Sequence, residues 1–180
     1  MPPFRNIDAK VLEYFARWLD RPQGSMVELT GTAGMEEPHM ARQHFLFHTA
    51  RDALCFCQLH IHLLDRPGNN VFTAIRLRPT AARLLELKSR FPNARTVGVF
   101  DDDLCGRVLD CKVALWQTGR DASFIWGGGE VAFTYRDRTF RVPEPRFSLH
   151  RFRTLTGMRS TYCTLKPKGF VSFAAMLAHS

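Results

Sequence analysis

The sequence predicts an α/β fold in which a mostly parallel sheet is flanked by helices and followed by an antiparallel β-hairpin. Between residues 44 and 116, short apolar runs alternate with amphipathic stretches, in the order strand then helix, three times. The run 96–100 is apolar throughout, as is typical of a strand buried on both faces. From residue 122 onward, short aromatic and β-branched runs separated by turn residues indicate antiparallel strands.

The first 41 residues are expected to form one helix and a connection. Apolar side chains between Ile7 and Leu19 recur at helical spacing, and Asn6 or Asp8 can cap that helix. Residues 21–41 mix turn formers with a short apolar run and predict a poorly defined connection with one edge strand. We therefore divide the chain into residues 1–41 and an α/β domain over residues 42–180, with the hairpin inserted at about 122–160.

The middle of the chain carries clear helix-start signals. Thr49 and Asp52 have capping-box spacing before a helix expected to end near residue 64, and Pro79-Thr80 opens the next helix. Each of the three helices follows an expected strand, and these strands span residues 44–47, 70–75 and 96–100. The third helix spans residues 104–116. The later strands are expected at 122–126, 131–135 and 139–142, an irregular stretch at 143–160, and a terminal helix at 170–178.

Positive charge is concentrated at one end of the sequence. The net charge is +8, and residues 131–180 hold nine Lys or Arg against two acidic residues, which is +7. Such an excess predicts an anionic partner for this segment. No apolar run is long enough for a membrane helix, and the first residues lack the apolar stretch of a signal peptide. Five cysteines without a CxxC pair fit a cytoplasmic protein without a zinc site.

Three aspartates follow the buried strand 96–100, where ligands collect in open α/β sheets. Asp101 and Asp103 can both offer oxygens to one Mg²⁺ ion. The alternative is that one of the three aspartates simply caps the helix that begins at residue 104. Composition and spacing leave both interpretations open.

The segment TVGVFDDDLCGRVLDCKVA resembles the second motif of Toprim domains, which occur in bacterial primases, type IA topoisomerases and their mobile-element relatives. Asp101, Asp103, Gly106 and Arg107 match that motif. The segment HFLFHTARDALCF is similar to the first motif, and TLKPKGFVSFAAML to the closing one. The residues that match these two motifs are Asp52, Ala53, Leu54, Pro167, Gly169, Phe173 and Leu177. The resemblance covers about residues 42–178 and implies a Rossmann-like parallel sheet.

The departures from the Toprim pattern fall on polar residues. His48 occupies the position of the family's general acid/base Glu, and Ser172 and Ala174 occupy the Asp and Asn positions of the closing motif. The resemblance thus implies a catalytic position at His48, Asp101 and Asp103, a metal site at Asp101 and Asp103, and weak Mg²⁺ binding, since Mg²⁺ prefers oxygen ligands. A domain that keeps its packing residues and loses its polar ones is most simply a binding descendant with degenerate catalysis.

The basic C-terminal segment is the second candidate site. Its arginines alternate with aromatic residues, and guanidinium groups pair with phosphates while exposed rings stack on bases. The arginines expected to bind nucleic acid are Arg107, Arg136, Arg138, Arg141, Arg151, Arg153 and Arg159. The alternative is that the aromatic rings fill a core beneath a solvated basic face.

The sequence thus predicts a Toprim-like nucleic-acid-binding protein of a plasmid or mobile-element primase or mobilization system. Single-stranded or backbone-directed DNA is the expected partner, although the sequence does not distinguish DNA from RNA. Two other functions stay open: an active Mg²⁺-dependent phosphotransfer enzyme, nuclease or primase-associated enzyme, and a protein-interaction module. The sequence leaves the oligomeric state open.

Overall fold

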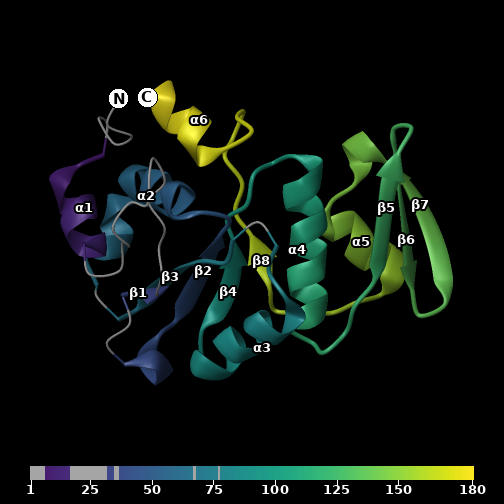
Figure 1. Ribbon diagram of the computed structural model, residues 1–180, viewed down its shortest axis with the longest axis horizontal. Coiled ribbons are helices and arrows are strands. Elements are labelled where there is room, and N and C mark those ends of the chain that lie inside the picture. The colour runs from purple at the N-terminus through teal and green to yellow at the C-terminus, as the bar shows by residue number, and fades with distance from the viewer. Residues whose placement is uncertain (1–6, 17–31, 35–36, 67, 77) are drawn as a thin grey trace.

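The computed structural model describes residues 7–16, 32–34, 37–66, 68–76 and 78–180. It has the α/β architecture that the sequence predicts, with a largely parallel sheet flanked by helices and a separate antiparallel sheet (Figure 1). The helices are α1 (Ala9–Phe15), α2 (Ala50–Leu59), α3 (Ala81–Arg90), α4 (Leu104–Trp116), α5 (Leu149–Thr156) and α6 (Phe173–Ala178), with 3₁₀ turns η1 (Pro38–Met40), η2 (Ile61–Leu64) and η3 (Glu144–Arg146). The strands are β1 (Thr32–Ala33), β2 (Gln43–Phe47), β3 (Asn70–Ala74), β4 (Arg95–Gly98), β5 (Ser123–Gly127), β6 (Glu130–Tyr135), β7 (Arg138–Pro143) and β8 (Cys163–Thr164).

The first sheet has the strand order β1-β3-β2-β4-β8. Strands β3, β2, β4 and β8 run parallel, and β1 pairs with β3 in the antiparallel direction. Because β2 lies between β3 and β4, the loops that follow these three strands meet at one edge of the sheet, the upper edge in Figure 1. This edge is where the first candidate site lies.

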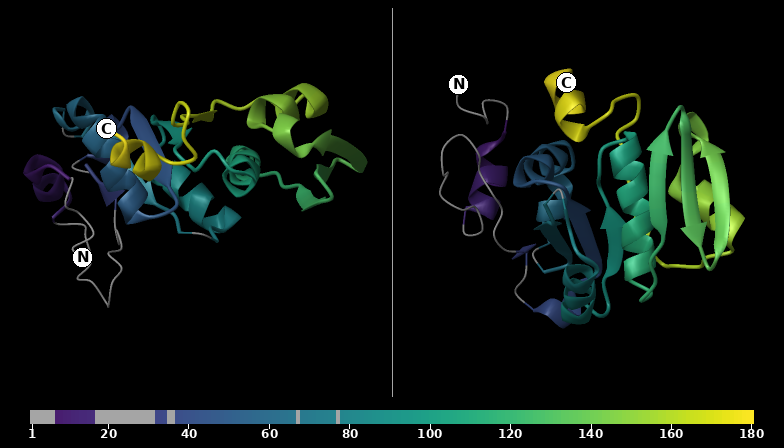
Figure 2. Two further views of the ribbon diagram at one scale, coloured as in Figure 1. Left: turned by 90° about the horizontal axis from the view of Figure 1, so that it is seen from above. Right: turned by 45° about the vertical axis from the view of Figure 1, so that its right-hand side comes forward.

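Helices cover both faces of the first sheet (Figure 2). Strand β2 alternates between the faces, because successive side chains of a strand point in opposite directions. Phe45 and Phe47 pack with α1, α2 and α6, whereas Leu46 packs with α3 and α4. Both faces are thus buried, as expected for a parallel sheet.

The second sheet, with strand order β5-β6-β7, follows α4 in the chain and lies at the end of the molecule away from α1 (Figure 1). Its inner face is aromatic: the Phe133 ring lies 4.9 Å from the ring of Phe152 in α5 and 6.1 Å from that of Phe147. The same core includes buried residues of α3 and α4. The second sheet is therefore joined to the first through α4 and not through strand pairing.

Several elements differ from the expectation. The stretch 143–160 is not irregular: it contains α5, whose N-cap Ser148 accepts a hydrogen bond from Arg151 N–H and whose C-cap Gly157 has φ +67°. The three strands expected at 122–126, 131–135 and 139–142 do form and pair as one antiparallel sheet, a small meander and not a simple hairpin. The helix that begins at residue 50 stops at Leu59, because His60 has non-helical backbone angles. Strand β8, only two residues long, was not predicted.

The N-terminal expectations are tested only in part. Asp8, one of the two predicted cap residues, is the N-cap of α1, and its side chain accepts a hydrogen bond from Lys10 N–H. The described part of residues 21–41 includes the short edge strand β1. The rest of the predicted helix after residue 16, and the apolar run at 26–29, lie outside the described residues. None of the helices described here is long and apolar enough to cross a lipid bilayer.

Candidate functional site

The structure brings His48 and the acidic loop 101–103 to adjacent ends of neighbouring strands. Strand β2 delivers His48 and β4 delivers the loop, and Val99 N–H, directly after β4, donates to the C=O of Leu46 in β2 at 2.8 Å. The His48 ring stacks on the ring of Phe100, with 4.8 Å between centroids. The two segments that resemble the first and second Toprim motifs therefore lie side by side.

Asp103 is the N-cap of α4. Its Oδ1 accepts a hydrogen bond from Gly106 N–H at 2.7 Å, which satisfies one of the free N–H groups of the first helical turn. Gly106 is needed here because a Cβ at this position would lie 2.1 Å from Asp101 C=O. The capping interpretation of the acidic cluster therefore holds for Asp103, and the glycine lets the acidic loop fold closely over the helix start.

Asp52 also has a structural partner at this edge. Its Oδ2 accepts hydrogen bonds from the N–H of Thr49 at 3.0 Å and from the Thr49 hydroxyl at 2.8 Å. The Thr49 hydroxyl in turn accepts from Asp52 N–H, completing the capping box that the sequence predicts at the start of α2. Asp52 still contributes negative charge to the edge.

The electrostatics of the edge favour neutral forms of its partly buried groups. Burial raises the pKa of Asp101, and the neighbouring carboxylates of Asp52 and Asp103 raise it further, whereas His48 and Lys166 oppose the shift. Burial also lowers the pKa of His48, with Asp101 the largest opposing influence. The imidazole of His48 offers a nitrogen atom at a position where a hard cation such as Mg²⁺ prefers an oxygen ligand.

A buried network beneath the acidic loop was not predicted. The Lys166 ammonium donates to the carbonyls of Phe100 and Asp101, both at 3.0 Å, and lies 2.8 Å from Oδ2 of Asp110. The Tyr162 hydroxyl donates to the other Asp110 oxygen at 2.6 Å. Burial raises the pKa of Asp110 to about 6, although Lys166 and Tyr162 act in the opposite direction. The network fixes the end of β4 to α4 and to the segment after β8.

One sequence signal could have revealed this network. Asp110 is a lone carboxylate on a helix whose neighbours are nearly all apolar, and charged residues are rarely fully buried unless they are paired. Gly98 on β4 leaves the room that the pair requires, because a Cβ there would lie 1.7 Å from the Tyr162 hydroxyl. The partners, which are 52 and 56 positions away in sequence, become evident only in the fold.

The residues at this edge do not fit a Mg²⁺ site well. In the part of the chain that the structure describes, no group of three His, Cys, Asp or Glu side chains is placed to hold a metal ion. One Asp103 oxygen is engaged with the helix start, and a lysine ammonium already lies close to the acidic loop. Mg²⁺ requires near-octahedral oxygen coordination, which these residues do not provide.

The structure separates the predicted nucleic-acid-binding arginines into two groups. The side chains of one group are exposed: Arg136, Arg138, Arg141, Arg151 and Arg159. Arg136 lies over the Tyr135 ring at 5.3 Å and Arg138 over the Phe140 ring at 5.6 Å. Arg141 lies 3.7 Å from Glu130, an exposed ion pair of little energetic weight. These guanidinium groups are accessible to an anionic ligand.

The other two arginines are internal connectors. Arg107 donates to the carbonyls of Glu144 and Phe147, at 3.4 and 3.3 Å, and so ties α4 to η3. Arg153 donates to the Tyr162 carbonyl at 2.6 Å and to Ser160. Both side chains hold the second sheet and α5 in place, so replacing either arginine would reduce the stability of the fold before it affects ligand binding.

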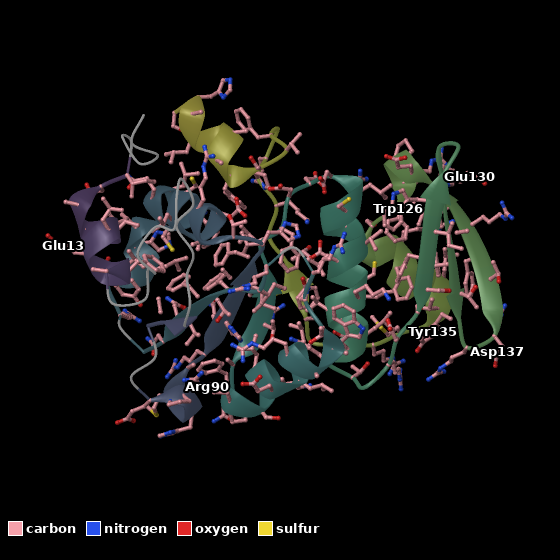
Figure 3. All side chains as sticks on the ribbon, viewed as in Figure 1. Glu13, Arg90, Trp126, Glu130, Tyr135 and Asp137 are labelled. Carbon is pink, nitrogen blue, oxygen red and sulfur yellow. The ribbon has the colours of Figure 1, made fainter. Side chains whose placement is uncertain are left out.

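The aromatic residues of the basic segment fill the core. Tyr135, Phe147, Phe152 and Tyr162 are buried, and Phe140 is half-buried. Rings in these positions cannot stack on bases, so this part of the expected base-stacking surface is absent among the described residues. Trp126 of β5 is 48 % exposed and lies at the opposite end of the second sheet from Tyr135 and Asp137 (Figure 3).

Comparisons of the chain with protein-family models, with curated proteins and with solved structures find no match.

Proposed function

We propose that this protein binds nucleic acid through backbone phosphates, using the exposed arginines of the second sheet and α5. The observation that carries the proposal is the segregation of charge. Residues 131–180 carry nine Lys or Arg against two acidic residues, and most of the arginines in that segment are exposed while most of its aromatic rings are buried. A cationic face on which most of the described aromatic rings are buried favours phosphates over bases.

The turn between β6 and β7 concentrates this charge. Arg136 is the first of the two turn residues and Arg138 is the first residue of β7, and Arg120 donates to the Tyr135 hydroxyl at 3.3 Å beside them. Asp137, at the tip of the turn, is the one carboxylate in this group of residues. Guanidinium groups around one end of a sheet can contact successive phosphates of a strand.

We further propose that the protein is a degenerate Toprim-like domain of a plasmid or mobile-element primase or mobilization system. The parallel sheet, the strand-end position of His48 and the acidic loop, and the motif resemblance support this proposal. The poor fit of the edge to Mg²⁺ supports a loss of catalysis. DNA is the expected nucleic acid in such a system.

A binding titration tests the proposal. Fluorescence anisotropy with labelled single-stranded and duplex DNA bearing 5′-hydroxyl ends, with and without Mg²⁺, measures the affinity. We expect binding in low salt that does not require Mg²⁺. The double variant Arg136→Gln/Arg138→Gln should bind about tenfold or more weakly, because each lost phosphate contact removes a charge-assisted hydrogen bond. The matched control is Arg83→Gln/Arg90→Gln, which removes two exposed charges from α3.

The outcomes separate the three functions. Binding that is weakened by the turn variants and unchanged by the α3 variants supports the proposal. DNA cleavage or phosphoryl transfer that needs Mg²⁺ and disappears in Asp101→Asn would establish the enzyme instead. An absence of measurable affinity for DNA or RNA at low salt would overturn nucleic-acid binding and leave the protein-interaction module.

A further inference from the structure

A polar pocket lies at the amino-terminal ends of the parallel strands, opposite the end of the sheet that carries His48. It has a volume of about 550 Å³ and is found where β2 and β3 begin, next to η2. Its polar lining residues are Arg42, Gln43, His62, Asp65, Arg66, Asn69 and Asn70. The volume is within the range of small-molecule sites and well above what a single inorganic anion needs.

The charge around this pocket is positive. Asp65, its one acidic lining residue, is held by the Lys10 ammonium at 2.7 Å, and the hydrogen bond from Lys10 lowers the pKa of that carboxyl. Arg42 and Arg66 form no ion pair with any residue that the structure describes. Among the described residues, therefore, neither of these two lining arginines has a carboxylate partner.

The walls of the pocket are built by hydrogen bonds within the fold. The carbonyl of Asn69 accepts from the backbone N–H groups of Arg42 and Gln43, at 2.9 and 3.1 Å. The Asn70 amide donates to the Leu63 carbonyl at 2.8 Å and so fixes η2 against the start of β3. The backbone that carries the lining residues is thus held in place before any ligand binds, which reduces the entropic cost of binding.

We propose that this pocket binds a phosphomonoester attached to a nucleoside. Arg42 and Arg66 suit the doubly charged phosphate, since guanidinium groups bind phosphate oxygens in pairs. The amides of Gln43 and Asn69 can both donate and accept, as the polar edges of a base or sugar require. Leu63 supplies an apolar contact within the same lining. The ligand is either a free nucleoside monophosphate or the 5′-phosphate end of a strand.

This inference does not depend on the proposed function, because the pocket and the basic turn are at different places in the fold. The turn would bind internal phosphodiesters, each with a single charge. The pocket would bind a terminal phosphate with a second ionisable oxygen. Ligands that carry one of these groups but not the other can therefore test each site separately.

Isothermal titration calorimetry with adenosine 5′-monophosphate tests the proposal. We expect saturable binding with one site per chain, competition by inorganic phosphate, and no binding of adenosine. The variant Arg42→Gln/Arg66→Gln should bind at least about tenfold more weakly, because two charge-assisted contacts are lost. Arg83→Gln/Arg90→Gln is the control with equal loss of charge, and Arg66→Glu alone should also abolish binding.

Oligonucleotides then identify the source of the phosphate. If a 5′-phosphorylated strand binds more tightly than its 5′-hydroxyl form, and this difference disappears in Arg42→Gln/Arg66→Gln, the ligand is a strand end. If the two forms bind equally while adenosine 5′-monophosphate still binds, the ligand is a free mononucleotide. Failure of the wild-type protein to bind the monophosphate, or equal binding by the double variant with its fold retained by circular dichroism, would overturn the proposal. Loss of 5′-hydroxyl DNA binding in the turn variants bears on the proposed function alone.

Discussion

His44, the second residue of β2, is a buried histidine that is only 2 % exposed. Its Nε2 lies 2.9 Å from the Thr73 hydroxyl of β3. Its ring and the ring of Phe91 form a T-shaped pair with 4.8 Å between their centroids. Complete burial lowers its pKa from 6.5 to about 3. The folded protein therefore keeps this imidazole neutral over a pH range in which the unfolded chain protonates it.

This histidine should make the fold sensitive to acid. Between about pH 6.5 and pH 3 only the unfolded chain binds the extra proton, so its contribution to stability is present above pH 6.5 and is lost as the pH falls. At pH 5 the loss is about 2 kcal/mol. Urea unfolding at pH 8 and pH 5 measures it, with His44→Gln as the variant that cannot titrate.

The comparison with His44→Gln is needed because Asp110 titrates in the same range. The pKa of Asp110 is raised to about 6 in the folded protein, so its contribution to stability increases as the pH falls below 6. That contribution is common to both proteins and cancels in the difference. An equal loss of stability in the wild-type protein and in His44→Gln would contradict the assignment.

Lys166 should matter more for stability than its position near the surface suggests. The change Lys166→Met leaves the Asp110 carboxylate buried without its cation and removes the donor to the Phe100 and Asp101 carbonyls. We expect a loss of about 3 kcal/mol in the free energy of unfolding. Asp110→Asn combined with Lys166→Met should recover part of it, because no buried charge is then left. The control is the exposed Lys168→Met, and a similar small effect for both lysines would disprove the role of the network.

Magnesium binding at the acidic loop should be weak. The loop offers Asp101 and Asp103 where the Toprim pattern that it resembles has a third carboxylate, and Asp103 is already engaged with Gly106. Calorimetry should detect no stoichiometric binding of Mg²⁺ at micromolar protein concentration, because the ion loses its water reluctantly. His48→Glu should strengthen binding if His48 occupies the position of the family's acid. Tight binding by the wild-type protein, abolished by Asp101→Asn, would instead support the enzyme.

At the scale of elements, the sequence predicted the helices and strands whose bounds are set by local features, such as a cap residue or a continuous apolar pattern. The helix 104–116 was predicted with its observed bounds, because Asp103 can cap its start and its apolar pattern is continuous. Strands β2 and β3 and the Thr49–Asp52 capping box were predicted for similar reasons. These elements carry His48 and the acidic loop, so the position of the first candidate site could be predicted.

Other elements depend on partners that are distant in sequence. Strand β8 has two residues and exists because Val97 and Gly98 of β4 pair with it. Helix α5 has only eight residues, and its apolar side chains Leu149, Phe152 and Leu155 pack with residues of α4 and the second sheet, although Ser148 and Gly157 are suitable cap residues. For the same reason, the sequence could not distinguish the exposed Arg151 from Arg153, whose hydrogen-bond partner Tyr162 is brought close only by the fold.

The turn between β6 and β7 has an unfavourable backbone conformation. Tyr135 pairs with Arg138, and the two residues between them, Arg136 and Asp137, have φ values of 50° and 60°. A two-residue turn of this kind favours Asn-Gly, because the left-handed region costs other residues about 1–2 kcal/mol each. The sequence thus keeps charged residues at a turn where they reduce stability.

Replacing the second residue of this turn should stabilise the protein. Asp137→Gly removes the side chain that opposes the left-handed conformation and leaves Arg136 in place. We expect a gain of about 0.5–1 kcal/mol, the strain relieved being partly offset by the flexibility of glycine in the unfolded chain. Asp137→Ala removes the same charge without relieving the strain and should bring no comparable gain. Thermal unfolding of the three proteins measures the difference, and equal stability of the two variants would refute the argument.

At the scale of the whole molecule, the first candidate site and the exposed basic residues lie on different parts of the fold. The first sheet carries the partly buried His48 and the acidic loop at one edge, whereas the exposed arginines of residues 131–180 lie on the second sheet and on α5 with its flanking residues. Helix α4 joins the two parts, because its buried face belongs to the core that includes Phe133 and Phe152. An anionic strand on the basic part would therefore not need to displace the buried network near Asp110.

This separation predicts how nucleic-acid binding responds to salt. Contacts between arginines and phosphates release counterions, so the logarithm of the affinity for single-stranded DNA should fall linearly with the logarithm of salt concentration, at about −0.7 per contact. With four or five of the exposed arginines engaged, the slope should be about −3 to −3.5. Arg151→Ala should make the slope shallower by about 0.7, equally for all sequences, because phosphate contacts carry no base information. Asp101→Asn, at the other sheet, should leave the slope unchanged. Titrations of 5′-hydroxyl strands at several salt concentrations measure these slopes, and a slope near zero, or one that changes with base sequence in Arg151→Ala, would contradict a phosphate-binding surface.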